Sequence, residues 1–268
     1  MTRPFLAGAA TGDGPTPIDQ PLGQRIVGVI RRPAATFRQV VAAPSWAGAL
    51  LFSALISVAA GAALMETQVG RQAQVDQWER TATAFGRHVD DAAYARLEEL
   101  SRANGVEYAS VSALISGPLL SVVIAALLPI FFRAGRSKNG VAPVGAAPAT
   151  VVPQQAVGFR QALAVTAHAG VILALRQVIA APVTYARESV STGASLGLWF
   201  STLDEASPVA RFLGAIDLFV VWWLVVLAIG TAALFGVRAG RTAGVFVAIY
   251  AALAVLLAIA MALSGGSA

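Results

Sequence analysis

The chain contains no cysteine and little charge. Without cysteine it can form neither a disulfide nor a thiolate site for a metal ion or for nucleophilic catalysis. Charged residues make up 12% of its 268 residues, whereas about a quarter of the residues in a soluble domain are charged. Hydrophobic residues make up 57%, and the mean hydropathy is +0.70. This balance leaves no room for a large polar domain and indicates a membrane protein with polar connecting segments.

The sequence also lacks the common motifs of phosphate-binding and zinc-dependent enzymes. It has no G-x-x-x-x-G-K loop and no H-E-x-x-H pair. A G-x-S-x-G pattern runs from Gly193 to Gly197, but a hydrolase needs a strand before that serine and a histidine base. No strand is expected before it, and no histidine follows it. We therefore expect a non-enzymatic protein with no catalytic, metal-binding or cofactor-binding residues and no cofactor.

The net charge of +5 raises the question of a nucleic-acid partner. The arginines lie beside apolar stretches, however, and basic residues in that position contact lipid headgroups. We therefore expect the lipid bilayer as a partner, and no nucleic acid.

Long apolar runs dominate the rest of the chain. In the most apolar run, 212–235, fourteen Leu, Ile, Val and Phe residues favour insertion by roughly 6 kcal/mol, against about 3 kcal/mol for its one charge, Asp217. Its 24 residues are long enough to cross a hydrocarbon core of about 30 Å. The sequence predicts an all-α fold, a polytopic integral membrane bundle of five transmembrane helices. The expected spans are about 46–65, 111–132, 161–181, 212–235 and 245–263.

The distribution of charge predicts the orientation of this bundle. Segments 1–45, 133–160 and 236–244 together carry 11 basic residues and two acids. Segments 66–110 and 182–211 carry seven basic residues and 11 acids. Because basic loops favour the cytoplasm, we expect a cytoplasmic N-terminus and a C-terminus outside.

The N-terminal region divides into a tail and an amphipathic segment. Residues 1–22, rich in Gly, Pro and Thr, are expected to be a disordered cytoplasmic tail. Residues 23–45 are expected to lie at the membrane interface, with a helix between Pro33 and Pro44. In one interpretation four arginines of this segment contact inner-leaflet lipid phosphates, and in the other the helix is a capped lead-in to the first span. The four are Arg25, Arg31, Arg32 and Arg38.

Residues 46–265 form the expected membrane domain, which contains one polar segment of some size. Residues 66–110 are expected to fold as an extracytoplasmic helical hairpin between spans one and two. Its second helix is expected to end at Leu100, before Asn104 and Gly105, because an Asn-Gly pair favours a turn.

Two further segments connect the spans. Residues 133–158 contain prolines and three basic residues but no acid, and we expect a flexible linker there. Residues 182–211 are expected to form an outer loop, with an interfacial piece at 196–200.

Polar groups inside the expected spans form a candidate cluster. Arg176 lies roughly 9 Å before the outer end of the third span, and Asp217 roughly 8 Å after the outer start of the fourth. Because the two charges have matching depth on consecutive antiparallel helices, we predict a direct ion pair between them. His168 lies two turns from Arg176 on roughly the same face, and we interpret it as a hydrogen-bonded packing residue. The cluster can be structural or functional.

Two functions fit this pattern. The first is a membrane-organising or scaffold factor that acts through helix packing and through contacts with lipid, a protein partner or a second copy of the chain. The alternative is a permease for a small solute or ion, which would use Arg176, Asp217 and His168. A permease often shows an inverted repeat, and the sequence has no internal repeat.

The order of features resembles a known family. The RRPAATFRQVVAAPSW lead-in has the pattern Pro-x-x-x-Phe from Pro33 to Phe37, span three contains Ala167-His168-Ala169, and Asp217-Leu218-Phe219 enters span four. Over about residues 25–263 this arrangement is similar to the bacterial branch of the Yip family, whose eukaryotic members interact with Ypt/Rab GTPases.

The resemblance implies a five-span bundle with a cytoplasmic N-terminus. The eukaryotic relatives act in vesicle traffic as GTPase-binding or membrane-shaping factors, whereas for bacterial members the resemblance implies no established activity. Together with the charge pattern, the resemblance leads us to expect a multi-pass protein of the cell inner (cytoplasmic) membrane.

Overall fold

The computed structural model describes residues 20–137, 157–187 and 216–265. These residues are almost entirely helical and contain no β-sheet. Three of our expectations fall outside them: the tail up to residue 19, most of the 133–158 linker, and the 188–215 loop with its Gly193–Gly197 pattern. The helices are α1 (Leu22–Arg31), α2 (Pro33–Ala42), α3 (Ala47–Met65), α4 (Gln68–Ala84), α5 (Asp91–Ser137), α6 (Phe159–Ala169), α7 (Val171–Arg187), α9 (Leu218–Phe235) and α10 (Ala239–Gly265).

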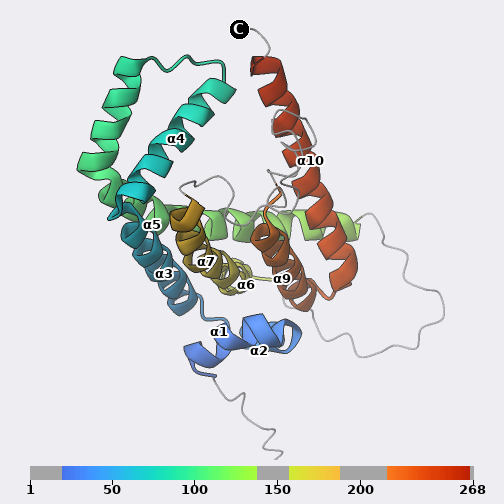
Figure 1. Ribbon diagram of the computed structural model, residues 1–268. Helices are drawn as coiled ribbons and strands as arrows, with labels where there is room; N and C mark the ends of the chain where they lie inside the picture. Colours follow the sequence, from blue (N-terminus) through green and yellow to red (C-terminus); the bar gives the residue numbers. More distant parts are fainter. Residues whose placement is uncertain (1–19, 138–156, 188–215, 266–268) are drawn as a thin grey trace, which may run out of the picture.

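The expected all-α class and the five apolar spans are confirmed. Five helical segments among the described residues are long and apolar enough to cross a membrane. They are α3, the later part of α5, α6 with α7, α9, and α10. Figure 1 shows α3, α7, α9 and α10 as the upright members, with α1 and α2 beneath them.

The helix pair α1–α2 packs on one end of the bundle. Pro33 begins α2 at a position where its missing N–H costs no hydrogen bond, and α2 ends just before Pro44, as the sequence predicts. Phe37 and Val40 are fully buried, while Arg38 between them is exposed. The apolar face of α2 therefore lies against α9 and α6.

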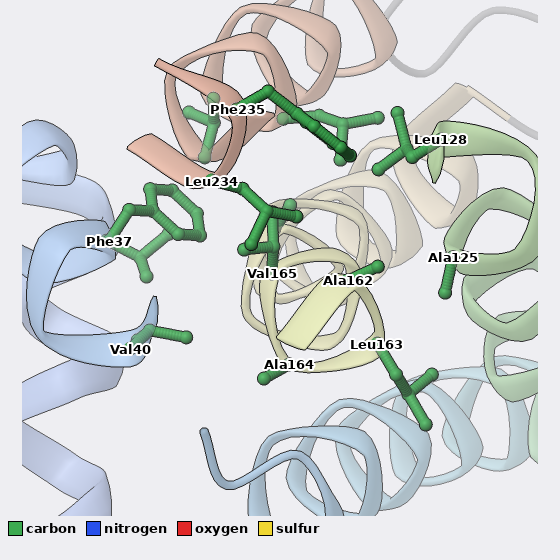
Figure 2. Packing of buried hydrophobic residues seen from close by; sticks show 14 of the residues in the cluster. Phe37, Val40, Ala125, Leu128, Ala162, Leu163, Ala164, Val165, Leu234 and Phe235 are labelled. Atoms are coloured by element: carbon green, nitrogen blue, oxygen red, sulfur yellow. The ribbon is translucent and has the colours of Figure 1, made fainter. Parts of the chain in front are cut away.

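The hydrophobic core lies where α2, α5, α6 and α9 meet. Figure 2 shows Phe37 of α2, Val165 of α6 and Leu234 of α9 pointing into one cluster, with Leu128 of α5 at its edge. The rings of Phe132 and Phe235 stack with centroids 4.9 Å apart, which joins the end of α5 to the end of α9. This packing brings the later ends of α5 and α9 to the same end of the bundle as α1–α2.

A close approach at Gly230 makes this packing sensitive to size. A Cβ atom at position 230 would lie 2.6 Å from Val165 Cγ1 and 3.0 Å from the ring of Phe37. Three helices therefore meet at a point with no space for a side chain on α9.

The polar segment after α3 folds as a two-helix hairpin, as expected. Thr67 caps α4 by accepting a hydrogen bond from the Gly70 N–H, and its own hydroxyl donates to the Leu64 carbonyl. Gly70 approaches that carbonyl so closely that a side chain would collide with it. Ser101 of α5 donates to the Arg71 carbonyl across the hairpin. Figure 1 shows α4 and the start of α5 extending beyond the end of α3.

The expected end of the hairpin's second helix at Leu100 is wrong. Helix α5 runs without a break from Asp91 to Ser137, through Asn104 and Gly105. At Gly105 the helix packs against α4, where Gln74 Oε1 lies 3.5 Å and Arg71 Cγ 3.9 Å from the position of an added Cβ. Tertiary packing of the glycine against its neighbour thus outweighs the turn preference of Asn-Gly.

Helix α5 changes direction on its way through the bundle. Its first part descends beside α4, and its later part crosses behind α7 and α9 in the view of Figure 1. Pro118 and Pro129 stand inside the helix. A proline removes one backbone donor and strains the preceding turn, which is the usual cause of a bend in a continuous helix.

Three expected span limits also shift. Span three is divided at Gly170 into α6 and α7, and α7 continues beyond Pro182 to Arg187 instead of ending at 181. Helix α9 begins only at Leu218, and α10 begins at Ala239, six residues before the expected 245. Relative to the ends of their helices, Arg176 and Asp217 therefore lie at other positions than expected.

Candidate functional site: polar groups of the bundle

Arg176 and Asp217 form an ion pair. Nε of Arg176 donates to Oδ2 of Asp217 at 2.5 Å, which joins α7 to the start of α9. The side chain of Asp217 is 14% exposed and that of Arg176 is 35% exposed. The predicted contact between these two charges is thus present.

Asp217 is the N-cap of α9 rather than a residue within it. Its Oδ1 atom accepts hydrogen bonds from the backbone N–H groups of Phe219 and Val220, and its own N–H donates to the hydroxyl of Tyr250 on α10. One aspartate therefore connects three spans. Its charge also lies at the helix N-terminus, where the helix dipole favours an anion.

The distance from the ion pair to the opposite end of the bundle is close to the thickness of a bilayer's hydrocarbon core. Helix α9 has 18 residues, and the stretch from Phe159 to Arg176 has 18 as well. At about 1.5 Å per residue both measure about 27 Å, close to the thickness of a hydrocarbon core. The expected depth of Asp217, well inside the span, is therefore corrected to the end of the span. Charges placed there cost less than charges at mid-membrane.

His168 is not part of this pair. It lies on α6, is 0% exposed, and its Nδ1 is 2.8 Å from the Ala164 carbonyl oxygen. A carbonyl only accepts, so Nδ1 carries the proton and Nε2 is left as an acceptor. Among the described residues Nε2 has no hydrogen-bond partner. The expected cluster of three residues thus separates into an ion pair and one buried histidine.

A cavity of about 210 Å³ lies between α3, α5, α6–α7 and α9. Arg176 and Gln177 line it at one end, and Ser53, Thr166 and other residues of the neighbouring helices line the remainder. The hydroxyl of Thr166 donates a hydrogen bond to the Ser121 carbonyl at 3.0 Å, which joins α6 to α5 at the cavity wall. The cavity reaches the arginine of the ion pair, but neither Asp217 nor His168 is among its described lining residues.

No group of three or more His, Cys, Asp or Glu residues that could hold a metal ion occurs among the described residues. The polar groups of the bundle can therefore bind, orient and connect helices, but they form no metal centre within the part of the chain described.

Comparison with known proteins decides the family. The model of the Yip1 domain matches residues 27–262, which is most of the chain. This chain belongs to the Yip1 family. No curated protein and no solved structure matches it. The resemblance seen in the order of the lead-in, the spans and the Asp217 motif is confirmed at the level of the family, and the bacterial branch stays a prediction.

The four arginines of α1–α2 differ in exposure, and the matched Yip1 domain, which begins at residue 27, contains three of them. Arg31, Arg32 and Arg38 are exposed. Arg25 is 2% exposed, and its Nη1 atom donates to the Ala43 carbonyl and to Ser45 Oγ. A guanidinium enclosed in this way cannot reach lipid phosphates, so the expected lipid contact of Arg25 is corrected. It fixes α1 to the turn that leads into α3.

Sequence reasoning missed two residues of the Yip1 domain's polar site. Tyr250 was not expected, because a tyrosine in an apolar helix gives no sign of its partner. The cavity and its Ser53 were also missed, since only the packing of four helices creates them. The Ser53-Ser57-Gly61 spacing shows that helices can approach there, but not that they leave a space.

Proposed function

We propose that this Yip1-family protein is a non-enzymatic, multi-pass factor of the cytoplasmic membrane that organises the bilayer through its N-terminal helix pair. In this proposal α1 and α2 lie in the inner leaflet at the cytoplasmic end of the bundle. They displace lipid there and so shape or mark the membrane for partners of the trafficking type.

The two-sided character of α1–α2 carries the proposal. On the side facing the protein, Val29, Phe37 and Val40 are all 0% exposed. On the other side, Val27 is 50% exposed and Ile30 is 38% exposed. A helix pair that buries one apolar face in the protein and presents another outward is suited to insertion between lipid headgroups.

Exposed arginines adjoin the outward apolar residues. Arg31, Arg32 and Arg38 lie on or next to α1–α2 and are exposed. Each basic residue near an anionic leaflet contributes about 1 kcal/mol of attraction. The combination of apolar insertion and cationic contact supports binding to an anionic inner leaflet.

A rigid attachment to the spans supports the same proposal. Phe37 packs beside Gly230 and Val165 with no spare space, and Arg25 fixes α1 to the turn before α3. An inserted helix pair bends a membrane only if it is held in the leaflet and cannot move out of it. The packing of Phe37 and the contacts of Arg25 supply that resistance.

The alternative of a permease receives less support. The cavity beside Arg176 extends to Thr166 and Ile124. The next residues of these two helices, Val165 and Ala125, belong to the buried hydrophobic core. His168, which the permease was expected to use, lies apart from the cavity's described lining. No specific contact among the described residues favours a conduction path.

Reconstitution into vesicles tests the proposal. We expect the wild-type protein to reduce the diameter of vesicles that contain phosphatidylglycerol, or to draw tubules from them, as the protein-to-lipid ratio rises. The triple variant Arg31→Glu, Arg32→Glu, Arg38→Glu should lose this effect. The matched control reverses three exposed arginines of the hairpin, Arg80, Arg87 and Arg102, and should behave like wild type.

Spin labelling gives an independent readout of insertion. Because the chain has no cysteine, a nitroxide can be placed at Val27→Cys alone. We expect this label to be accessible to oxygen and protected from a water-soluble relaxation agent, as for a site in the acyl region. A label in water, or vesicles that respond equally to wild type and the α1–α2 triple variant, would refute the proposal.

A further inference from the structure

The cavity beside Arg176 has a shape that the proposed function does not use. It follows α6 and α7 from Thr166 to Arg176, ten residues or about 15 Å. Ala125 and Val165, the chain neighbours of the lining residues Ile124 and Thr166, are fully buried in the core. A volume of about 210 Å³ spread over that length describes a narrow slot, which suits an extended chain better than a compact solute.

The lining of the slot is mainly apolar, and its charge is positive. Arg176 is its charged member, and no carboxylate occurs among the described lining residues. A bound molecule therefore meets hydrocarbon along most of its length and a cation at one end. The larger apolar members are Leu50, Leu120, Ile124, Leu173 and Trp223.

Asp217 occupies only one side of the Arg176 guanidinium. The carboxylate accepts from Nε, and neither Nη group has a hydrogen-bond partner among the residues that the structure describes. The arginine side chain is 35% exposed, so it can be reached from outside the protein. Two amino groups are thus available to a second anion, and arginine binds carboxylates and phosphates through such paired donors.

Ser53 indicates that the slot is not filled by the protein alone. It lines the slot, and its Oγ is buried without a hydrogen-bond partner among the described residues. A buried hydroxyl without a partner is costly, above all where lipid excludes water. A water molecule enclosed beneath a bound chain would satisfy this hydroxyl.

We propose that the slot binds one hydrocarbon chain of an anionic amphiphile, with the headgroup on the Nη groups of Arg176 and the chain extending toward Thr166. The shared chemistry is an anionic headgroup on an aliphatic chain of medium length. Its source is a free fatty acid or an anionic phospholipid of the bilayer.

Native mass spectrometry of the full chain in a neutral polyoxyethylene detergent measures this binding. The probes are laurate, dilauroyl phosphatidylglycerol and, as a chain without an anion, dodecanol. We expect one or both anionic probes to be retained at one copy per protein. Dodecanol should bind at least tenfold more weakly, since it offers the arginine no charge.

Gly117 allows the slot to be blocked without disturbing its walls. It lines the slot, and no atom lies within 4 Å of an added Cβ. Gly117→Leu should therefore fold and should weaken binding of the anionic probe at least tenfold. The matched control is Gly244→Leu on α10, a position equally open but outside the slot's described lining, and it should bind like wild type.

Two further variants separate headgroup binding from the ion pair. Arg176→Gln and Asp217→Asn both break the pair. Arg176→Gln should lose binding at least tenfold, whereas Asp217→Asn should bind as tightly as wild type or more tightly, because a competing carboxylate is gone. A role of Arg176 that was only structural would make the two variants lose binding together.

The outcomes divide clearly. The proposal is supported if the protein retains laurate or phosphatidylglycerol, and if Gly117→Leu and Arg176→Gln weaken this binding while Asp217→Asn does not. The probe that is retained identifies the source of the amphiphile. Equal binding by Gly117→Leu and wild type, parallel loss in the two ion-pair variants, or retention of neither anionic probe overturns it. None of these results depends on whether α1–α2 shapes membranes, so the two proposals succeed or fail separately.

Discussion

Asp217 accepts the Nε–H of Arg176 with one carboxylate oxygen and caps α9 with the other. The side chain of Asp217 thus sets where α9 begins, and its contact with Arg176 fixes which part of α7 lies beside that start. The residue that looks from the sequence like a cost of insertion is in the structure a connection between α7 and α9, and through Tyr250 to α10 as well.

The ion pair should show coupling in a double-mutant cycle of Arg176→Gln and Asp217→Asn. We expect a coupling free energy of about 1 kcal/mol, because the pair is partly exposed and a surface-type contact contributes at that level. The measurement is reversible unfolding in mixed micelles. Stability changes of the two single variants that simply add in the double variant would contradict the pairing.

The capping role of Asp217 can be separated from its charge. Asp217→Asn keeps a side-chain acceptor for the N–H groups of Phe219 and Val220, whereas Asp217→Ala removes it. We expect the alanine variant to be less stable than the asparagine variant by about 1 kcal/mol. Hydrogen exchange at residues 219 and 220 should rise in the alanine variant only. Equal exchange in both variants would show that the cap does not hold the start of α9.

Gly230 should tolerate no side chain. Gly230→Ala places a Cβ within 2.6 Å of Val165 Cγ1, and overpacking of this kind costs about 1–3 kcal/mol. Gly240→Ala on α10 is the control, since nothing lies within 4 Å of its Cβ and alanine favours a helix. Thermal unfolding of both variants should show a loss for the first and no loss for the second. An unchanged Gly230→Ala would mean that α2 does not press against α9.

The hairpin should loosen at alkaline pH through Tyr94. Its hydroxyl donates to Asp76 across the hairpin, and this hydrogen bond raises the pKa of Tyr94 above its ordinary value of 10.0. Because the pKa is higher in the folded than in the unfolded hairpin, the contribution to stability is complete below pH 10 and is lost as the pH rises through the folded pKa.

Hydrogen exchange of α4 measures this effect. Protection should fall above pH 10 in the wild type, after correction for the intrinsic rate, and the additional fall should be absent in Tyr94→Phe. The same alkaline fall in both proteins would exclude Tyr94 as its cause.

Much of the fold could be predicted because insertion into a bilayer is a local property. The apolar runs, Pro33 at the start of α2 and the pairing of two isolated charges each follow from a few neighbouring residues. The family was recognisable for the same reason, since Pro33–Phe37 and Asp217–Phe219 are short patterns within segments of fixed order.

The rest depends on contacts between distant segments. The start of α9 could not be predicted, because the residues before Asp217 are as apolar as those after it, and only Arg176 and Tyr250 fix the cap. The burial of Arg25 depends on Ala43 and Ser45, and the continuity of α5 through Gly105 depends on Gln74. Such tertiary contacts have no local pattern in the sequence.

We predict a five-span chain whose ends lie on opposite sides of the membrane, with α1–α2 inside and the hairpin outside. The absence of native cysteine makes single-cysteine labelling direct, with sites at Ala35 in α2, Thr83 in the hairpin and Ala268 at the C-terminus. We expect a membrane-impermeant thiol reagent to label positions 83 and 268 in intact cells and position 35 only after the membrane is opened. Labelling of positions 35 and 268 from the same side would contradict it.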